Sequence, residues 1–190
     1  MEGNLILPAL VAVAFATAFN LWLTFRLAAR LRESMAPPFT VPLGESVPPF
    51  EGIARAQSQA TGSADLAGRS TVLVFLTPGC KTCAGHVPEL VEALNGAERL
   101  GVNLWIVPND DRHDVDILVA GTPLAERVLI LGSADRRRLN PRMAAPFYLF
   151  IDEASTALAS SMLGDEDWRT FVEQMREAVV SPAGFEPATY

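Results

Sequence analysis

The chain has 190 residues, of which 49% are hydrophobic and 19% are charged, and its formal net charge at pH 7 is −7. This length allows one ordinary domain with additions and is sufficient to bury a hydrophobic core. A surface that binds nucleic acid needs a basic face, so the acidic balance argues against a nucleic-acid partner.

The first segment in chain order is apolar. No charged residue occurs from Gly3 to Phe25, and as a helix these residues would extend about 34 Å, more than the roughly 30 Å of a bilayer's hydrocarbon core. We therefore predict that residues 1–26 form an N-terminal transmembrane helix anchoring the chain in a lipid bilayer. A cleaved signal peptide is one alternative, because Ala16 and Ala18 form a small-residue cleavage pattern, although a basic start is missing. A buried core helix is the other.

The charges around this segment bear on its orientation. Arg26, Arg30 and Arg32 follow the apolar run, and no lysine or arginine precedes it. The positive-inside rule therefore predicts that the rest of the chain lies in the cytoplasm.

Residues 27–50 are predicted to hold the end of this helix and then a proline-rich spacer, which would be extended and semi-rigid. The prolines of the spacer are Pro37, Pro38, Pro42, Pro48 and Pro49. A globular domain is predicted over residues 51–180, and the tail at 181–190, with two prolines and a glycine, is predicted to be disordered.

The globular domain is organised around residues 70–90. Thr71 to Leu76 form an apolar, β-branched run, too short for a helix and bounded by Pro78 and Gly79, which predicts a buried strand. Cys80 and Cys83 follow at the start of a predicted helix, and their spacing places both sulfur atoms on one helix face. The unpaired N–H groups at a helix start favour a thiolate there.

The rest of the domain alternates strands and helices. Further strands are predicted at 102–107, 127–131 and 147–151, with 155–163 as a hairpin partner of the last, and helices at 80–95, 110–120 and from 165 to about 179. This alternation indicates an α/β fold whose sheet is mostly parallel, with helices on both faces.

Cys80 and Cys83 are the only cysteines, and three interpretations are open for them. A structural disulfide is unfavoured because closing so short a loop restrains the unfolded chain very little. A zinc site is unfavoured because it needs about four ligands, and only His86 and His113 could add to the cysteines. We therefore favour a redox-active pair in which Cys80 is the nucleophile and Cys83 resolves the mixed disulfide.

This region resembles the thioredoxin superfamily. The shared features are a strand, a CysXaaXaaCys at the start of the next helix, a proline five residues later at Pro88, and the segment Ala144 to Asp152. The resemblance implies a thioredoxin-like α/β fold with a central mixed sheet flanked by helices. It also implies that Pro146 is a cis proline beside the cysteines and that Ala145 and Pro146 bind an extended substrate segment.

Within this superfamily the chain is most similar to the membrane-anchored TlpA and ResA type, which includes MauD-like proteins. The similarity lies in the N-terminal segment, in Leu43 to Phe50 and in Asp65 to Ser70. It differs in having Gly79 where many relatives have tryptophan, and Val74 where thioredoxin has a buried acid.

That resemblance implies a membrane-tethered thiol-disulfide oxidoreductase acting on cysteine-containing exported proteins and exchanging electrons with a membrane redox partner. The Cys80–Cys83 disulfide would be its redox group, with no further cofactor and no metal. The catalytic domain would then be extracytoplasmic, opposite to the orientation that the arginine residues predict.

Two other functions remain open. Thr77 to Cys80 resemble the peroxidatic segment of some peroxiredoxins, although Leu73 replaces their proline. A copper metallochaperone of the Sco type would share the fold and an anchor, but its cysteines stand one residue farther apart. Among other polar residues, His86 lies one turn after Cys83 and is interpreted as a surface residue, as are His113 and the loop predicted at Arg136 to Arg138.

Overall fold

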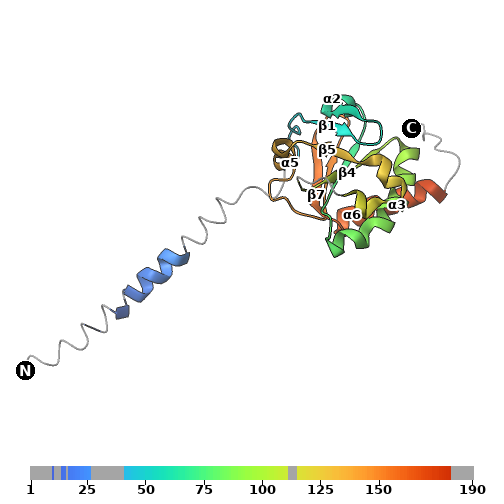
Figure 1. Ribbon diagram of the computed structural model, residues 1–190. Helices are drawn as coiled ribbons and strands as arrows, with labels where there is room; N and C mark the ends of the chain where they lie inside the picture. The colour runs from blue at the N-terminus through green and yellow to red at the C-terminus, as the bar shows by residue number, and fades with distance from the viewer. Residues whose placement is uncertain (1–9, 11–13, 16, 27–40, 111–114, 181–190) are drawn as a thin grey trace, which may run out of the picture. The chain divides into compact units, whose positions relative to one another are not determined.

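The computed structural model describes residues 10, 14–15, 17–26, 41–110 and 115–180, which belong to two compact units, residues 1–37 and 38–190 (Figure 1). Each unit is described separately below. His113 and the predicted tail at 181–190 lie outside the described residues.

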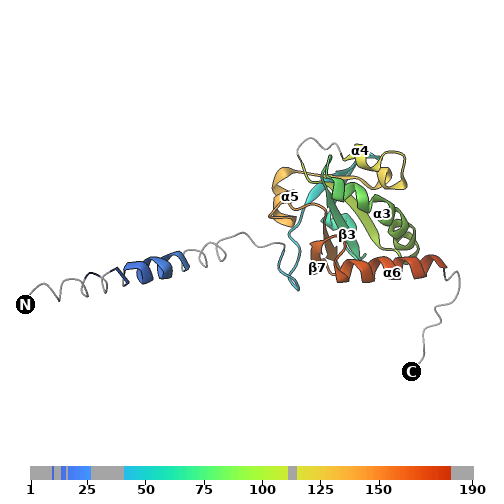
Figure 2. The ribbon, with the colours of Figure 1, turned by 90° about the horizontal axis from the view of Figure 1, so that it is seen from below.

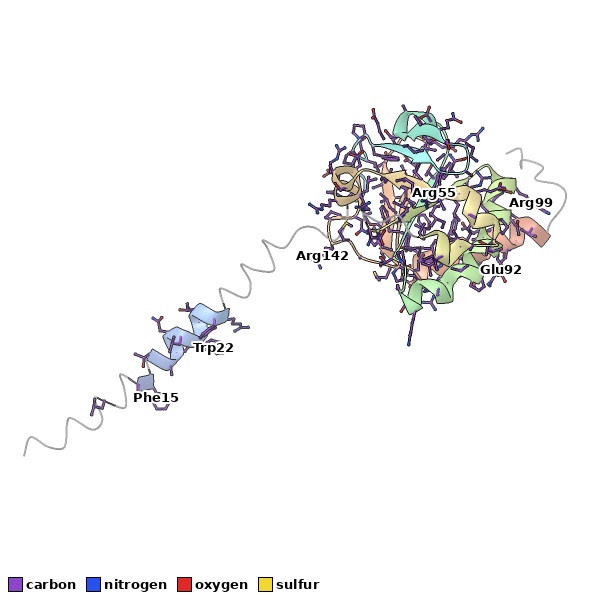
Figure 3. All side chains as sticks on the ribbon, viewed as in Figure 1. Phe15, Trp22, Arg55, Glu92, Arg99 and Arg142 are labelled. Carbon is purple, nitrogen blue, oxygen red and sulfur yellow. The ribbon has the colours of Figure 1, made fainter. Side chains whose placement is uncertain are left out.

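All described residues of the first unit are helical. The helix exposes large apolar side chains, including Phe15 and Trp22 (Figure 3), and the Arg26 guanidinium lies 5.1 Å from the centre of the Trp22 ring. Within the part of the chain that the structure describes, no helix has both the length and the apolar character needed to cross a membrane. The predicted transmembrane helix extends over residues 1–26, many of which are not described.

The second unit contains a four-stranded sheet in the order β4-β3-β6-β7. Its strands are β3 (Thr71–Leu76), β4 (Asn103–Pro108), β6 (Phe147–Ile151) and β7 (Ala157–Met162). Strands β3 and β4 are parallel, whereas β6 is antiparallel to both β3 and β7. The prediction of a mostly parallel sheet is therefore wrong, because the chain reaches β6 from the carboxyl end of β3, where Phe75 pairs with Phe147.

A three-stranded antiparallel sheet contains β1 (Glu51–Ala54) between β2 (Gln59–Gly62) and β5 (Leu129–Leu131). A parallel bridge between Ile106 and Val128 brings this sheet next to β4. The β1–β2 hairpin was not predicted, because its strands of four residues each carry small and polar side chains without apolar alternation.

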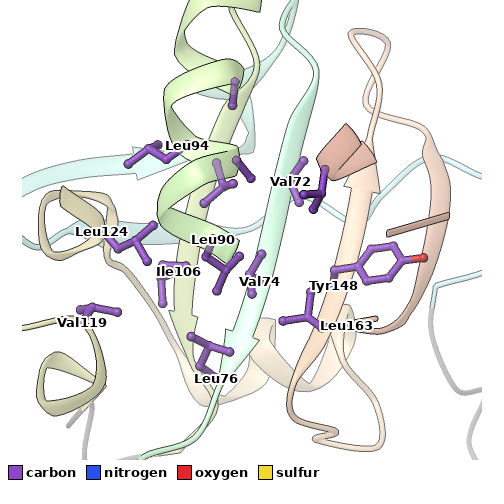
Figure 4. Close-up of a cluster of buried hydrophobic side chains, with 14 of the residues drawn as sticks. Val72, Val74, Leu76, Leu90, Leu94, Ile106, Val119, Leu124, Tyr148 and Leu163 are labelled. Atoms are coloured by element: carbon purple, nitrogen blue, oxygen red, sulfur yellow. The ribbon is translucent and has the colours of Figure 1, made fainter. Parts of the chain in front are cut away.

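Two helices lie side by side (Figure 2): α3 (Lys81–Leu100) and α6 (Glu166–Val180). The remaining helical segments are α2 (Ser63–Leu66), α4 (Asp116–Val119), the 3₁₀ helix η1 (Pro123–Arg127) and α5 (Ser133–Leu139). Strand β3 is buried along its whole length, with Val72, Val74 and Leu76 facing one apolar cluster and Leu73 and Phe75 facing another. The first cluster, which contains residues of α3 and α6, is drawn in Figure 4.

The packing of α3 against α6 explains why α3 continues past its predicted end at Gly96. A Cβ atom at Gly96 would lie 2.1 Å from the carbonyl oxygen of Met175, so this glycine allows the two backbones to approach closely. Glu92 pairs with Arg176, and Arg99 donates to the carbonyl of Val179 at 3.0 Å. Glu92 and Arg99 are labelled in Figure 3. The helix ends at Gly101 instead, whose φ of 71° suits a glycine.

The end of the predicted spacer is part of the globular unit. Val41, Val47 and Phe50 are buried in the second apolar cluster. Residues 44–47 also pair with residues 155–157, which end at the first residue of β7, through hydrogen bonds such as that from the Gly44 N–H to the Ala157 carbonyl at 2.8 Å. The domain therefore begins earlier than the predicted residue 51, because apolar residues between the prolines supply core contacts.

The loop predicted at Arg136 to Arg138 is also different in the structure. These residues form the last turn of α5, and Arg136 is only 2% exposed. The run of charges indicated a solvated segment, but a tertiary contact buries one of them.

Candidate active site

The segment before the cysteines is a tight turn. The Cys80 N–H donates to the carbonyl of Thr77 at 3.3 Å, and Gly79 has a φ of 74°. Proline and then a left-handed glycine at the two central positions are typical of a type II turn. This conformation accounts for Gly79, since a bulky residue such as tryptophan would be strained with a positive φ.

Cys80 is the N-cap residue of the 20-residue helix α3. Its Sγ accepts a hydrogen bond from the Cys83 N–H at 3.1 Å. The side chain is partly exposed and borders the first apolar cluster. A sulfur atom that accepts from a helix N-terminus is stabilised as a thiolate, by the hydrogen bond and by the helix dipole.

Cys83 has a different environment. Its side chain is fully buried in the first apolar cluster, which also includes Val74 on β3. Burial, and next the contact with the Cys80 side chain, raise the pKa of the Cys83 thiol to about 12. The two thiols, both free in the structure, are therefore chemically unequal, because one borders solvent and the other lies among apolar side chains.

The predicted substrate-binding residues precede β6. The bond between Ala145 and Pro146 is cis, as the resemblance implied. Ala145 borders the same apolar cluster as Cys80, and the Pro146 carbonyl accepts from the Leu163 N–H at 3.1 Å. The structure thus places Cys80 and Ala145, which are far apart in sequence, at the edge of one cluster.

Two buried asparagines hold the chain just before this proline, and sequence reasoning missed both. Asn109 follows β4 and is 6% exposed, and Asn140 caps the end of α5 and is fully buried. Their side chains contact each other and the backbone of Met143 and Ala144. The only sequence signal was a pair of amide side chains at element ends, which is common in turns.

The histidine nearest the cysteines in sequence has its own partners. Nδ1 of His86 lies 2.9 Å from a carboxylate oxygen of Glu89, and its ring would contact a Cβ added at Gly164. This placement agrees with the interpretation of His86 as a helix-surface residue.

No protein-family model and no curated protein matches the chain. Solved structures do. The thioredoxin domain of a thiol-disulfide oxidoreductase from Bacteroides vulgatus is 18% identical, with a TM-score of 0.57, and the match covers 70% of this chain and 98% of that chain. A Chlorobium tepidum protein described as thiol:disulfide interchange protein DsbE is 18% identical over 74% of this chain and 99% of its own, with a TM-score of 0.60. The exposed lipoprotein thioredoxin of Streptococcus pneumoniae is 14% identical over 68% of this chain and 98% of its own, with a TM-score of 0.51.

These similarities show the fold. The globular unit has a thioredoxin-like α/β fold with a mixed sheet and flanking helices, as the sequence resemblance implied.

Proposed function

We propose that this protein is a thiol-disulfide oxidoreductase that is tethered to a membrane and exchanges disulfides with exported proteins. The observation that carries the proposal is the hydrogen bond from the Cys83 N–H to the Cys80 sulfur at 3.1 Å, at the start of a long helix. Several proteins of similar fold are described as thiol-disulfide oxidoreductases or interchange proteins, which supports the same reaction class.

In the reducing direction, the Cys80 thiolate attacks one sulfur of a substrate disulfide. A new S–S bond joins Cys80 to the substrate, the substrate's own S–S bond breaks, and its other sulfur leaves as a thiolate that takes a proton from water. Cys80 suits this step because its sulfur is partly exposed and accepts a hydrogen bond from the backbone N–H of Cys83 at the start of α3.

Cys83 completes the reaction. It gives up its proton and attacks the Cys80 sulfur, which releases the second substrate thiol and leaves a Cys80–Cys83 disulfide. The substrate has then gained two electrons and the protein has lost two. The reverse sequence oxidises a dithiol substrate, and in both directions Cys83 must exchange a proton from a buried, apolar position.

Ala145 and Pro146 are the proposed substrate-binding residues. Ala145 borders the cluster that Cys80 also borders, and Pro146 lies between Ala145 and the first residue of β6. An extended substrate segment placed there would present its disulfide to the Cys80 sulfur.

The membrane tether is proposed from the N-terminal segment. Its uncharged run from Gly3 to Phe25 is long enough to cross a bilayer as a helix, and the described part of that helix exposes large apolar side chains. A similar solved protein is described as an exposed lipoprotein thioredoxin, which supports an extracytoplasmic position for the catalytic unit. Exported proteins with cysteines, and a membrane redox partner that resets the pair, are the partners that this position implies.

The test is the reduction potential of the cysteine pair, measured on the full chain in detergent micelles equilibrated in glutathione redox buffers. A potential near about −270 mV would make the protein a reductase and one near about −120 mV an oxidant. If no Cys80–Cys83 disulfide forms at any ratio, the proposal is wrong. Peroxide-dependent turnover would instead support a thiol peroxidase, and copper binding that needs both cysteines would support a Sco-like metallochaperone.

A further inference from the structure

The asparagine pair forms a complete hydrogen-bond network. The Asn109 amide nitrogen donates to the carbonyls of Met143 at 2.7 Å and Ala144 at 3.1 Å, and its oxygen accepts from the Asn140 amide nitrogen at 3.3 Å. The Asn140 nitrogen also donates to the Ala144 carbonyl at 2.8 Å, and its oxygen accepts from the Ala144 N–H at 3.0 Å. Both N–H groups and the oxygen of each amide are therefore used.

Backbone hydrogen bonds of the two asparagines connect the ends of three elements, β3, β4 and α5. The Asn109 N–H donates to the carbonyl of Leu76 at the end of β3, and the Met143 N–H donates to the Asn140 carbonyl. The pair thus links the ends of β3 and β4 and the end of α5 to the chain before Pro146. Because buried amides are stabilising only when their hydrogen bonds are complete, this network holds residues 143 and 144 in one arrangement.

The network also determines which backbone groups remain for another molecule. The N–H and carbonyl of Ala144 and the carbonyl of Met143 are occupied by the asparagine side chains. Next in the chain, the Pro146 nitrogen carries no hydrogen and its carbonyl accepts from Leu163. Among the described residues, no hydrogen bond is made to the N–H or the carbonyl of Ala145, which is partly exposed.

We infer that Asn109 and Asn140 are positioning residues that restrict backbone pairing with a substrate to the single residue Ala145. This inference rests on the proposed function. An extended peptide would pair with the N–H and carbonyl of Ala145, as residues pair in an antiparallel ladder, and the occupied groups at 143 and 144 would prevent the peptide from shifting along the segment. The polypeptide disulfides of the proposed function would therefore gain from the network, and a small disulfide without a peptide backbone would gain nothing from it.

The test compares how fast the protein reduces two substrates. The full chain is used, pre-reduced and held in detergent micelles. One is a disulfide-linked peptide with several residues on each side of its cysteine, and the other is 5,5′-dithiobis(2-nitrobenzoic acid), which has no backbone amides. The measured quantity is the second-order rate constant for the peptide divided by that for the small disulfide. The amount of Cys80 thiolate affects both rates, so it cancels in this ratio.

The informative variants are Asn109→Asp and Asn140→Asp. Each keeps the side-chain size but replaces an N–H donor with an acceptor that faces a carbonyl, so the segment before Pro146 loses its fixed position. We expect the ratio to fall about tenfold, the effect of losing roughly one hydrogen bond's worth of substrate binding. Rates measured up to saturating peptide should show the larger part of the fall in the KM for the peptide. Asn109→Ser is a milder variant for the case in which an aspartate prevents folding, and near-UV circular dichroism reports on the fold.

Asn103→Asp is the matched control. Asn103 lies at the opposite end of β4, partly buried, and donates to the Thr71 hydroxyl at 3.4 Å. It should leave the ratio within about twofold of the wild type, because β4 separates it from the site by roughly 20 Å.

A folded Asn109 or Asn140 variant with an unchanged ratio would overturn the inference, as would an equal loss with both substrates. If the wild-type chain reduces neither substrate, the proposed function is contradicted. Normal folding of the Asn109→Asp variant would show that this failure is not due to misfolding.

Discussion

The two halves of the candidate site are built differently. The half that carries the thiols is contained in residues 77–83, where one turn and the first turn of α3 fix the position of both sulfur atoms. The half that precedes Pro146 depends on Asn109 and Asn140, which lie 31 residues apart in the sequence and on different elements. The comparison teaches that the reactive chemistry is local, whereas the surface that orients a substrate is a product of tertiary structure.

The largest expected effect separates the two cysteines within the local half. Cys80→Ser should abolish reduction of a peptide disulfide, because the partly exposed thiol of the pair is lost. Cys83→Ser should keep the first step and accumulate the mixed disulfide, since no second thiol attacks it. Mass spectrometry under non-reducing conditions measures both outcomes. A Cys83→Ser variant that turns over as fast as the wild type would show that the two thiols do not act in sequence.

The next effect sharpens the difference in burial between the thiols. The pKa of Cys83 is raised to about 12, mainly by burial, so below that value its thiolate fraction rises with pH. In the Cys80→Ser variant, the rate of Cys83 alkylation should increase about tenfold per pH unit from about pH 7 to about pH 10, without a plateau. Alkylation by iodoacetamide, followed by mass spectrometry, provides the rates. A plateau within this range would mean that Cys83 titrates as an ordinary thiol.

A smaller effect concerns the half before β6. Pro146→Ala adds an N–H beside Ala145, because proline has none. An extended substrate could accept this additional hydrogen bond, so the mixed disulfide should be released roughly threefold to tenfold more slowly. Single-turnover release measures the change, with Pro88→Ala in α3 as a control. Release at the native rate would remove Pro146 from the substrate-binding surface.

The smallest effect tests the hydrogen bonds that connect β6, the strand after Pro146, to the start of α6. The Tyr148 hydroxyl donates to both carboxylate oxygens of Asp165 at 3.0 Å. One of these oxygens also accepts from the backbone N–H of Trp168 near the start of α6. Tyr148→Phe should lower the free energy of unfolding by about 1 to 2 kcal/mol and leave the alkylation rate of Cys80 unchanged. Urea denaturation measures the first and a thiol assay the second. A change in Cys80 reactivity would mean that the two halves are coupled through β6.

The sequence was informative where a feature depends on neighbouring residues. Strands β3 and β6 were both predicted with their observed bounds, because each is a compact apolar run, and the cysteines were recognised from their spacing. The cis bond at Pro146 was implied by resemblance alone.

The remaining features depend on contacts between distant segments. Asn109 and Asn140 carry no local sign that they will meet, and Arg136 lies within a charged run although it is buried. Gly96 was interpreted as the end of a helix, when its role is to allow the backbone of Met175 to approach. In each case the local sequence predicts one role for the residue, and its contacts in the packed interior give it another.

The pairing of residues 44–47 with the start of β7 affects whether the protein self-associates. β7 is the last strand of its sheet, and such an edge offers free backbone groups to strands of other molecules. The segment before β1 occupies the first part of this edge, with Gly44 and Glu45 both bonded to Ala157. A fragment that starts at residue 48 would therefore expose this part of the edge as well and should self-associate more readily, whereas one that starts before Val41 keeps this part covered and retains the core contacts of Val41 and Val47.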